Sequence, residues 1–116
     1  MKIVFTALSK HNFYFKDFIT KYVLDKDCVP LNPFMLFNYF MLDTVERDRV
    51  RAANNELVRK ADELWVFGEI SDGVLKEIKL AESLKKPIKY YKILDSKNIK
   101  EISKNEIEFE EGIKLL

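Results

Sequence analysis

The sequence has few of the residues that cross-link a chain or bind metal. Cys28 is the only cysteine and His11 the only histidine among 116 residues. A disulfide framework needs paired cysteines and a metal cluster needs several ligands, so the sequence predicts neither. No apolar run reaches the roughly 18 residues of a membrane-spanning helix, and the N-terminus has no signal-peptide pattern. We therefore expect a soluble, cytoplasmic protein with no metal, no cofactor and no membrane partner.

An excess of charge of one sign is missing too. The 20 basic and 19 acidic residues leave a net charge of +1. Proteins that bind duplex nucleic acid usually present a basic face and have a high pI, so we expect no duplex nucleic acid as a partner. Hydrophobic residues, in contrast, make up 47% of the chain. That content and the chain length predict one folded domain with a modest core.

Short apolar runs alternate with segments of helical periodicity along the chain. The expected strands are residues 3–8, 28–31, 63–67 and 88–94, and the expected helices are residues 13–25, 43–61 and 72–85. Such alternation is typical of βαβ units. The sequence thus predicts a three-layer α/β fold of the Rossmann or flavodoxin-like kind. It has a mainly parallel sheet of four to five strands with helices on both faces. Pro30 and Pro33 make the second strand short or place it at an edge.

We expect two segments outside this regular pattern. Residues 95–116 form a charged extension to an α/β domain of residues 1–94, and they either add a short edge strand or form a tail. Residues 34–42 (FMLFNYFML) are too apolar for an exposed loop. They form part of the core or of a subunit interface, or an aromatic wall on which a nucleobase stacks. An apolar patch of this size on a small domain favours a homo-oligomer.

Polar residues follow the expected strand ends. In a doubly wound α/β fold, ligands bind beyond the carboxyl ends of the strands. The candidate ligand-binding residues in these segments are Ser9, Lys10, His11, Asn12, Asn32, Pro33, Ser71 and Gly73. Their hydroxyl, amide and ammonium groups can donate to a phosphate or a ribose, and the start of a helix attracts anions. A capping or surface role suits His11 equally well.

The helix of residues 72–85 begins with a glycine that needs an explanation. Gly73 in the first turn costs roughly 1 kcal/mol relative to Ala, which makes sense if a ligand approaches the backbone closely. The alternative is an ordinary helix capped by Ser71 or Asp72. Glu77 lies one turn further on, where a carboxylate could attack an anomeric carbon. The alternative for Glu77 is a surface residue paired with a lysine.

Three ordered motifs resemble those of a known group of enzymes. They are A-D-x-L-W-V-F over residues 61–67, D-G-x-x-x-E-I-x-x-A over residues 72–81, and K-K-P-I over residues 85–88. Their spacing resembles the nucleoside 2-deoxyribosyltransferase superfamily, which includes the 2'-deoxynucleoside 5'-phosphate N-glycosidases. The resemblance implies cleavage or transfer at the N-glycosidic bond of a small nucleoside or nucleotide, without a cofactor. The first loop (TALSKHN, residues 6–12) lacks the glycine that relatives carry there.

The resemblance also implies roles for individual residues. Glu77 matches the nucleophile, and Asp62 and Asp72 are the acidic candidates that bind or protonate the base. Asp62 has an alternative structural role at the start of a strand. Asp48 and Arg47 match charged positions that face the site in relatives, although a solvated helix face explains them equally well. A second function stays open: a protein that binds a nucleotide or a nucleotide signal in the same pocket without cleaving it.

Overall fold

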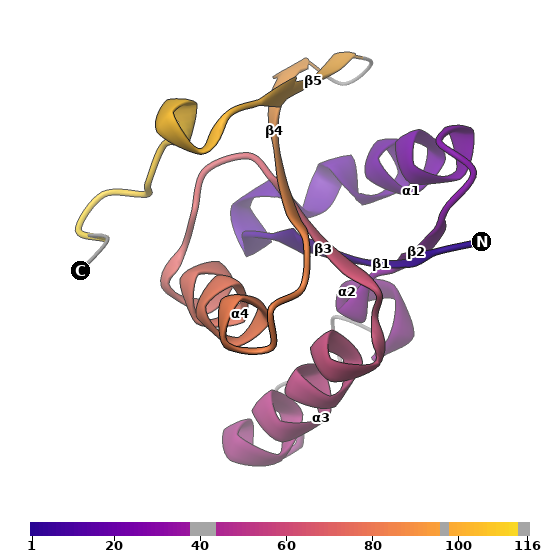
Figure 1. The fold of residues 1–116 in the computed structure, drawn as a ribbon. Helices are drawn as coiled ribbons and strands as arrows, with labels where there is room; N and C mark the ends of the chain where they lie inside the picture. Colours follow the sequence, from indigo (N-terminus) through magenta and orange to yellow (C-terminus); the bar gives the residue numbers. More distant parts are fainter. Residues whose placement is uncertain (38–43, 96–97, 114–116) are drawn as a thin grey trace.

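A five-stranded sheet organises the chain (Figure 1). The computed structural model describes residues 1–37, 44–95 and 98–113. The strands are β1 (Ile3–Leu8), β2 (Val29–Leu31), β3 (Glu63–Phe67), β4 (Ile88–Asp95) and β5 (Asn98–Ile102), in the spatial order β2-β1-β3-β4-β5. The first four are parallel, and β5 pairs with β4 in the antiparallel sense. The predicted α/β fold with a mainly parallel sheet is confirmed.

The two central strands are apolar almost throughout. Every residue of β3 and all but the first of β1 are buried, as expected for parallel strands covered on both faces. Their register pairs Leu8 with Phe67, so both strands end at the same edge of the sheet. β2 is an edge strand of the sheet: among the described strands it pairs with β1 alone, and its Pro30 lies beside Val4. This position agrees with the expectation from Pro30, because proline cannot donate to a sheet ladder.

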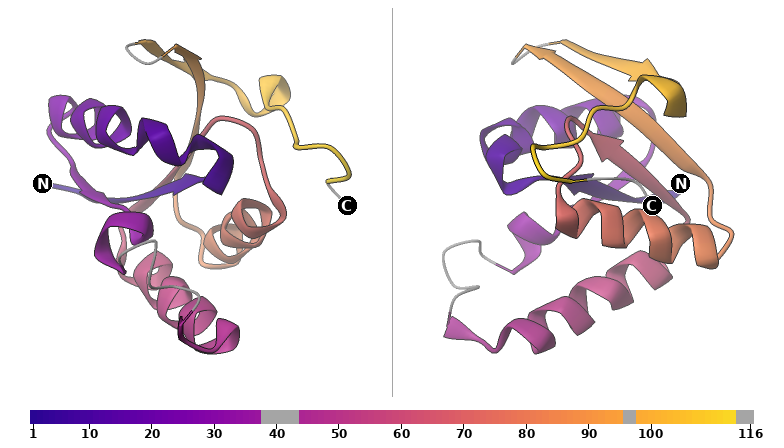
Figure 2. Two further views of the ribbon diagram at one scale, coloured as in Figure 1. Left: turned by 180° about the vertical axis from the view of Figure 1, so that it is seen from behind. Right: turned by 90° about the vertical axis from the view of Figure 1, so that its left-hand side faces the viewer.

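Helices cover both faces of the sheet, as predicted. They are α1 (Lys16–Asp25), α2 (Pro33–Leu36), α3 (Arg47–Lys60) and α4 (Asp72–Ser83). Alternate residues of β1 and β3 pack against α1 on one face and against α3 and α4 on the other. Both views in Figure 2 show this three-layer arrangement. Within the described residues, no helix is long and apolar enough to cross a membrane.

Two helices begin differently in the structure from what the sequence predicted. The segment expected as a helix from residue 13 begins instead with a 3-10 helix, η1 (Lys10–Phe15), and α1 follows it directly. Ser9 starts η1 because its side chain accepts a hydrogen bond from the His11 backbone N–H. The helix expected from residue 43 begins at Arg47. Asp43, and residues 38–42 of the apolar segment, lie outside the described residues.

The C-terminal segment, defined here as residues 103–113, returns to the carboxyl end of β3. A 3-10 helix, η3 (Lys104–Glu106), follows β5. Further along, Phe109 forms a parallel bridge with Ile70. The Ile70 N–H donates to the Glu108 carbonyl at 2.9 Å, and the Glu110 N–H donates to the Ile70 carbonyl at 3.0 Å. Residues after β5 therefore lie beside the loop that follows β3.

Candidate functional site

A pocket of about 980 Å³ lies at the carboxyl edge of the sheet. The chain leaves β1 toward the face covered by α1, and it leaves β3 toward the face covered by α4. This divergence is the point at which doubly wound folds bind ligands. The pocket is lined from the end of β1, the start of η1, α2, α3, the first turns of α4 and the C-terminal segment.

Glu77 reaches the pocket from the second turn of α4. Ser71 caps this helix, since its Oγ accepts a hydrogen bond from the Val74 N–H at 3.2 Å. Asn54 of α3 donates from Nδ2 to Glu77 Oε2 at 2.6 Å. Lys76, a lysine with which Glu77 could have paired, instead lies 3.1 Å from Asp72. The Glu77 side chain therefore has a neutral amide as its partner and borders the pocket.

The environment of Glu77 favours the protonated carboxyl. Burial raises its pKa from 4.5 to about 7, and the hydrogen bond from Asn54, which favours the ionised form, opposes this only in part. Burial disfavours a charge because the surrounding protein solvates it less well than water does. At neutral pH, both protonation states of Glu77 are consequently populated. Carboxyls with pKa values displaced in this direction are common among catalytic groups.

Ser9, His11 and Glu110 form a second polar cluster in the same pocket. Ser9 Oγ donates to Glu110 Oε2 at 2.5 Å, and His11 Nδ1 lies 2.9 Å from the same oxygen. Ser9 is buried, whereas His11 is exposed and Glu110 is partly exposed. Burial raises the pKa of Glu110, but the hydrogen bonds from Ser9 and His11 outweigh it and hold the pKa below its usual value. Glu110 is therefore ionised at neutral pH.

Charges of both signs and apolar side chains line the rest of the pocket. Lys10, Arg47 and Arg51 supply positive charge, while Phe34 and Phe37 supply aromatic surface. Cationic groups can bind an anionic portion of a ligand, and aromatic faces can stack on a planar ring. The arrangement suits a small polar ligand that has both an apolar ring and hydroxyl or anionic groups.

Eight of the twelve candidate residues from the sequence line this pocket. They are Ser9, Lys10, His11, Pro33, Ser71, Asp72, Gly73 and Glu77. Gly73 has an ordinary negative φ, and a Cβ added there would have Ser71 Oγ, 4.0 Å away, as its nearest neighbour. The fold thus has room for a larger side chain at Gly73, and the space beside it belongs to the pocket.

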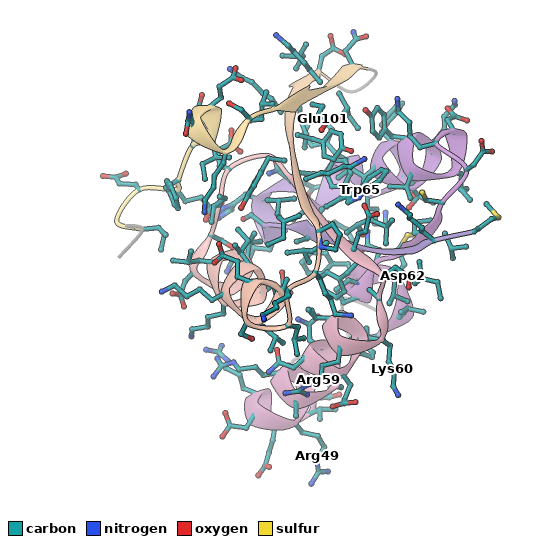
Figure 3. All side chains as sticks on the ribbon, viewed as in Figure 1. Arg49, Arg59, Lys60, Asp62, Trp65 and Glu101 are labelled. Carbon is teal, nitrogen blue, oxygen red and sulfur yellow. The ribbon has the colours of Figure 1, made fainter. Side chains whose placement is uncertain are left out.

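Asp62 and Asp48 lie away from the pocket lining. Asp62 is exposed where the end of α3 meets the start of β3, at the amino edge of the sheet (Figure 3). Its Oδ2 accepts a hydrogen bond from the Ile3 N–H at 2.7 Å, which joins the starts of β3 and β1. Asp48 is exposed on the first turn of α3 and lies 3.8 Å from Arg51.

Asn12 and Asn32 are buried beside the pocket rather than in its lining. Asn12 Nδ2 lies 3.4 Å from a carboxylate oxygen of Glu69 and packs against Gly68. Asn32 caps α2, because its Oδ1 accepts a hydrogen bond from the Phe34 N–H at 3.0 Å. Within the described part of the chain, the Asn32 Nδ2 has no hydrogen-bond partner. Both asparagines hold the turns that follow β1 and β2.

Two hydrogen-bonded residues of the pocket were not among the sequence candidates. Asn54 lies in the middle of α3, and asparagine is a poor helix former. Its presence there could have indicated from the sequence that the side chain has a specific role. Glu110 carried no such signal, because 101 residues separate it from Ser9. Only the folded chain shows that the C-terminal segment forms one wall of the pocket.

Comparison with known proteins gives a family and a fold. Residues 5–91 match the family model described as "Domain of unknown function (DUF7768)". A search of curated proteins found no match. A solved structure described as "2-desoxiribosyltransferase from Leishmania mexicana" superposes with a TM-score of 0.60 and 17% sequence identity. The match covers 79% of this chain and 65% of that one, so this chain spans under two thirds of that protein's length. At this identity the similarity shows a shared fold.

Proposed function

The chain belongs to the family described as "Domain of unknown function (DUF7768)", and because that description assigns no activity, we propose one from the site. The protein cleaves or transfers the N-glycosidic bond of a nucleoside or nucleotide, with Glu77 as the nucleophile. One observation carries the proposal: a partly buried glutamate with a pKa of about 7 borders a large pocket at the carboxyl edge of the sheet.

The reaction follows from the two oxygens of Glu77. Asn54 binds Oε2, so Oε1 is the oxygen that attacks the anomeric carbon C1' of the sugar. A bond forms between Oε1 and C1' while the C1'–N bond breaks, and the electron pair of that bond leaves with the base. The glycosyl-enzyme is then attacked at C1' by water, which gives hydrolysis, or by a second base, which gives transfer.

The fold supports this chemistry at a coarse level. A protein described as a 2-desoxiribosyltransferase has the same fold. The three motifs around residues 61–88 resemble that superfamily in sequence, and we propose that this chain is a small relative of it. Of the acidic candidates, Asp72 borders the pocket, whereas Asp62 lies at the other edge of the sheet.

The pocket lining suggests the class of substrate. Phe34 and Phe37 offer surfaces on which a base can stack, and Lys10, Arg47 and Arg51 offer positive charge to a phosphate. A nucleoside monophosphate would use both sets of groups. Exposed apolar side chains on η1 and α2, namely Tyr14, Met35 and Leu36, are consistent with the proposal that the protein is a homo-oligomer.

The test is product analysis with a panel of deoxyribonucleosides, ribonucleosides and their monophosphates. We expect release of free base, or exchange of the base when a second one is added. Denatured samples should contain a glycosyl adduct on Glu77, detected by mass spectrometry. Glu77→Gln should lose both signals. Glu82→Gln is the matched control, because Glu82 lies on the same helix, is exposed and pairs with Lys104.

The same panel tests the alternative of a nucleotide-binding protein. A protonated Glu77 can donate a hydrogen bond to a ligand oxygen, and a pKa of about 7 makes that form abundant at neutral pH. Recovery of a tightly bound but intact nucleotide would favour binding over cleavage. Absence of both binding and turnover across the panel would contradict both functions.

A further inference from the structure

The proposed nucleophile leaves one task of the reaction unassigned. When the C1'–N bond breaks, the departing base accepts an electron pair, and a proton donor makes it a better leaving group. Glu77 must be ionised to attack, so it cannot be the donor in the same step. Asp72 borders the pocket but is paired with Lys76 at 3.1 Å. Asp62 lies at the amino edge of the sheet.

The cluster of Ser9, His11 and Glu110 has the geometry of a proton-transfer site. His11 Nδ1 lies 2.9 Å from Glu110 Oε2. A carboxylate oxygen only accepts hydrogen bonds, so Nδ1 carries the hydrogen. In the described part of the chain, the other ring nitrogen, Nε2, has no hydrogen-bond partner. It is thereby available to a ligand in the pocket that His11 borders.

Glu110 is itself held firmly in place. Its backbone N–H bonds to the Ile70 carbonyl at 3.0 Å, and its carboxylate accepts the Ser9 hydroxyl at 2.5 Å. The Ser9 hydroxyl oxygen also accepts the His11 backbone N–H at 3.2 Å. The turn that carries His11 and the carboxylate that orients its ring are consequently tied together. Such a carboxylate fixes the histidine tautomer, as partner groups of catalytic histidines commonly do.

We propose that His11 is the general acid and base of the reaction and that Glu110 is its positioning residue. This role rests on the proposed function. The proton on Nε2 moves to the base nitrogen as the C1'–N bond breaks and Glu77 bonds to C1'. The neutral imidazole then takes a proton from the water that attacks C1', which releases Glu77 and restores the protonated histidine. Protons and electron pairs balance over the two steps, and no co-reactant other than water is needed.

The charged groups around His11 come from two elements. Glu110 faces the ring from the C-terminal segment, and Lys10 precedes it on the same 3-10 helix. Lys10 also acts on the charge of Glu110. The charges of Glu110 and Lys10 therefore act together on the site around His11.

The kinetic test compares leaving groups. For a natural base that needs a proton, we expect His11→Gln to lower kcat by about 100-fold or more with little change in KM. For a 4-nitrophenyl deoxyriboside, whose leaving group needs no proton, the same variant should keep most of the rate of the first step, measured as the initial burst of 4-nitrophenolate. Its later hydrolysis step should slow, because water then lacks its base. Equal losses in the first step on both substrates, or no loss on either, would overturn the role of His11. If the wild type turns over neither substrate, the proposed function falls and this role falls with it.

The structural test reads the histidine directly and does not need activity. His11 is the only histidine, so its two ring nitrogens give unambiguous ¹⁵N signals. We expect the neutral ring of the wild type to carry its hydrogen on Nδ1 and Glu110→Gln to lose that preference. Glu110→Asp should restore it in part. Glu108→Gln is the control, because Glu108 is exposed on the same segment and pairs with Lys92 at 3.6 Å. A tautomer that does not respond to Glu110 would overturn the positioning role.

Discussion

Two glutamates of the same strand–helix unit, one at the start of β3 and one in the second turn of α4, have opposite electrostatic environments. Glu63 begins β3 at the amino edge of the sheet and is buried, with Lys2 Nζ 2.7 Å away and a hydrogen bond from Trp65 Nε1 at 2.9 Å. Burial alone would raise its pKa, but these partners lower it below the ordinary value. Glu77, beyond the carboxyl end of β3, has the neutral amide of Asn54 as its partner and a pKa of about 7.

The difference shows how the fold stabilises the charge of one carboxylate and leaves that of another poorly stabilised. Glu63 has a cation and an indole N–H, so its charge is stabilised and its oxygens are occupied. Among the residues that the structure describes, only Oε2 of Glu77 has a hydrogen-bond partner, and its charge is poorly stabilised. Burial alone does not decide the direction of the pKa shift, because both residues experience it. What matters is whether the fold supplies a compensating charge.

The largest expected effect is on turnover. Glu77→Gln should lower kcat/KM by about 10⁴-fold or more, as expected when a nucleophile is removed, while Glu63→Gln should leave turnover within a few-fold. Kinetics on the best substrate of the panel, with both variants folded by circular dichroism, makes the comparison. A similar loss of turnover in the two variants would remove the functional distinction between the two edges of the sheet.

The second effect is on stability as a function of pH. Glu77 binds its proton more tightly in the folded chain, so its contribution is fully present below about pH 4.5 and is lost as pH rises through about 7. At about 1.4 kcal/mol per pKa unit, the loss is about 3 kcal/mol at most. Urea unfolding from pH 5 to pH 8 should show this decline in the wild type. In Glu77→Gln the decline should be smaller, whereas an unchanged slope would contradict the raised pKa.

Glu63 should give a smaller effect with the opposite pH dependence. Its lowered pKa means that its contribution is present above its ordinary pKa and is lost as pH falls through the folded value. Glu63→Gln weakens a charge-assisted bond to Trp65, so we expect a loss of about 1–2 kcal/mol in the free energy of unfolding at pH 7. Urea unfolding of this variant and of the exposed Glu56→Gln control, at pH 7 and again at acid pH, measures this loss of free energy. A loss that persists unchanged in acid would contradict the assignment.

The smallest effect separates two glycines at the carboxyl edge. Gly73→Ala should raise helix stability by up to about 1 kcal/mol, since the nearest atom to its Cβ, apart from the adjacent residues and the helix's own backbone, is Ser71 Oγ at 4.0 Å. It should nevertheless weaken ligand binding, because Gly73 borders the pocket. Gly68→Ala should destabilise the fold, because Gly68 has φ +83° and its Cβ would lie 2.5 Å from Asn12 Nδ2. Thermal unfolding and ligand titration of both variants distinguish the cases. Unchanged affinity in Gly73→Ala would mean that no ligand approaches this backbone.

The layers of the fold were predictable, and some long-range contacts were not. Alternating apolar runs and helical periods indicated the parallel sheet, and Pro30 indicated an edge position for β2. The position of Asp62 was predictable in the same way. It directly precedes a parallel strand, so it lies at the amino edge of the sheet, away from a pocket at the carboxyl edge. The sequence left open whether the end of the chain adds a strand. Its antiparallel strand β5 and the contact of Glu110 with Ser9 depend on pairings between distant residues.

The bridge between Ile70 and Phe109 has a consequence for the rate at which ligands enter and leave. The C-terminal segment is joined to the β3 loop by few backbone hydrogen bonds, and weakly bonded segments open locally without global unfolding. Each opening would withdraw Glu110 from Ser9 and His11 together. The hydrogen-exchange rates of the Ile70 and Glu110 amides therefore report how often the C-terminal segment separates from the β3 loop. A bound ligand should slow that exchange.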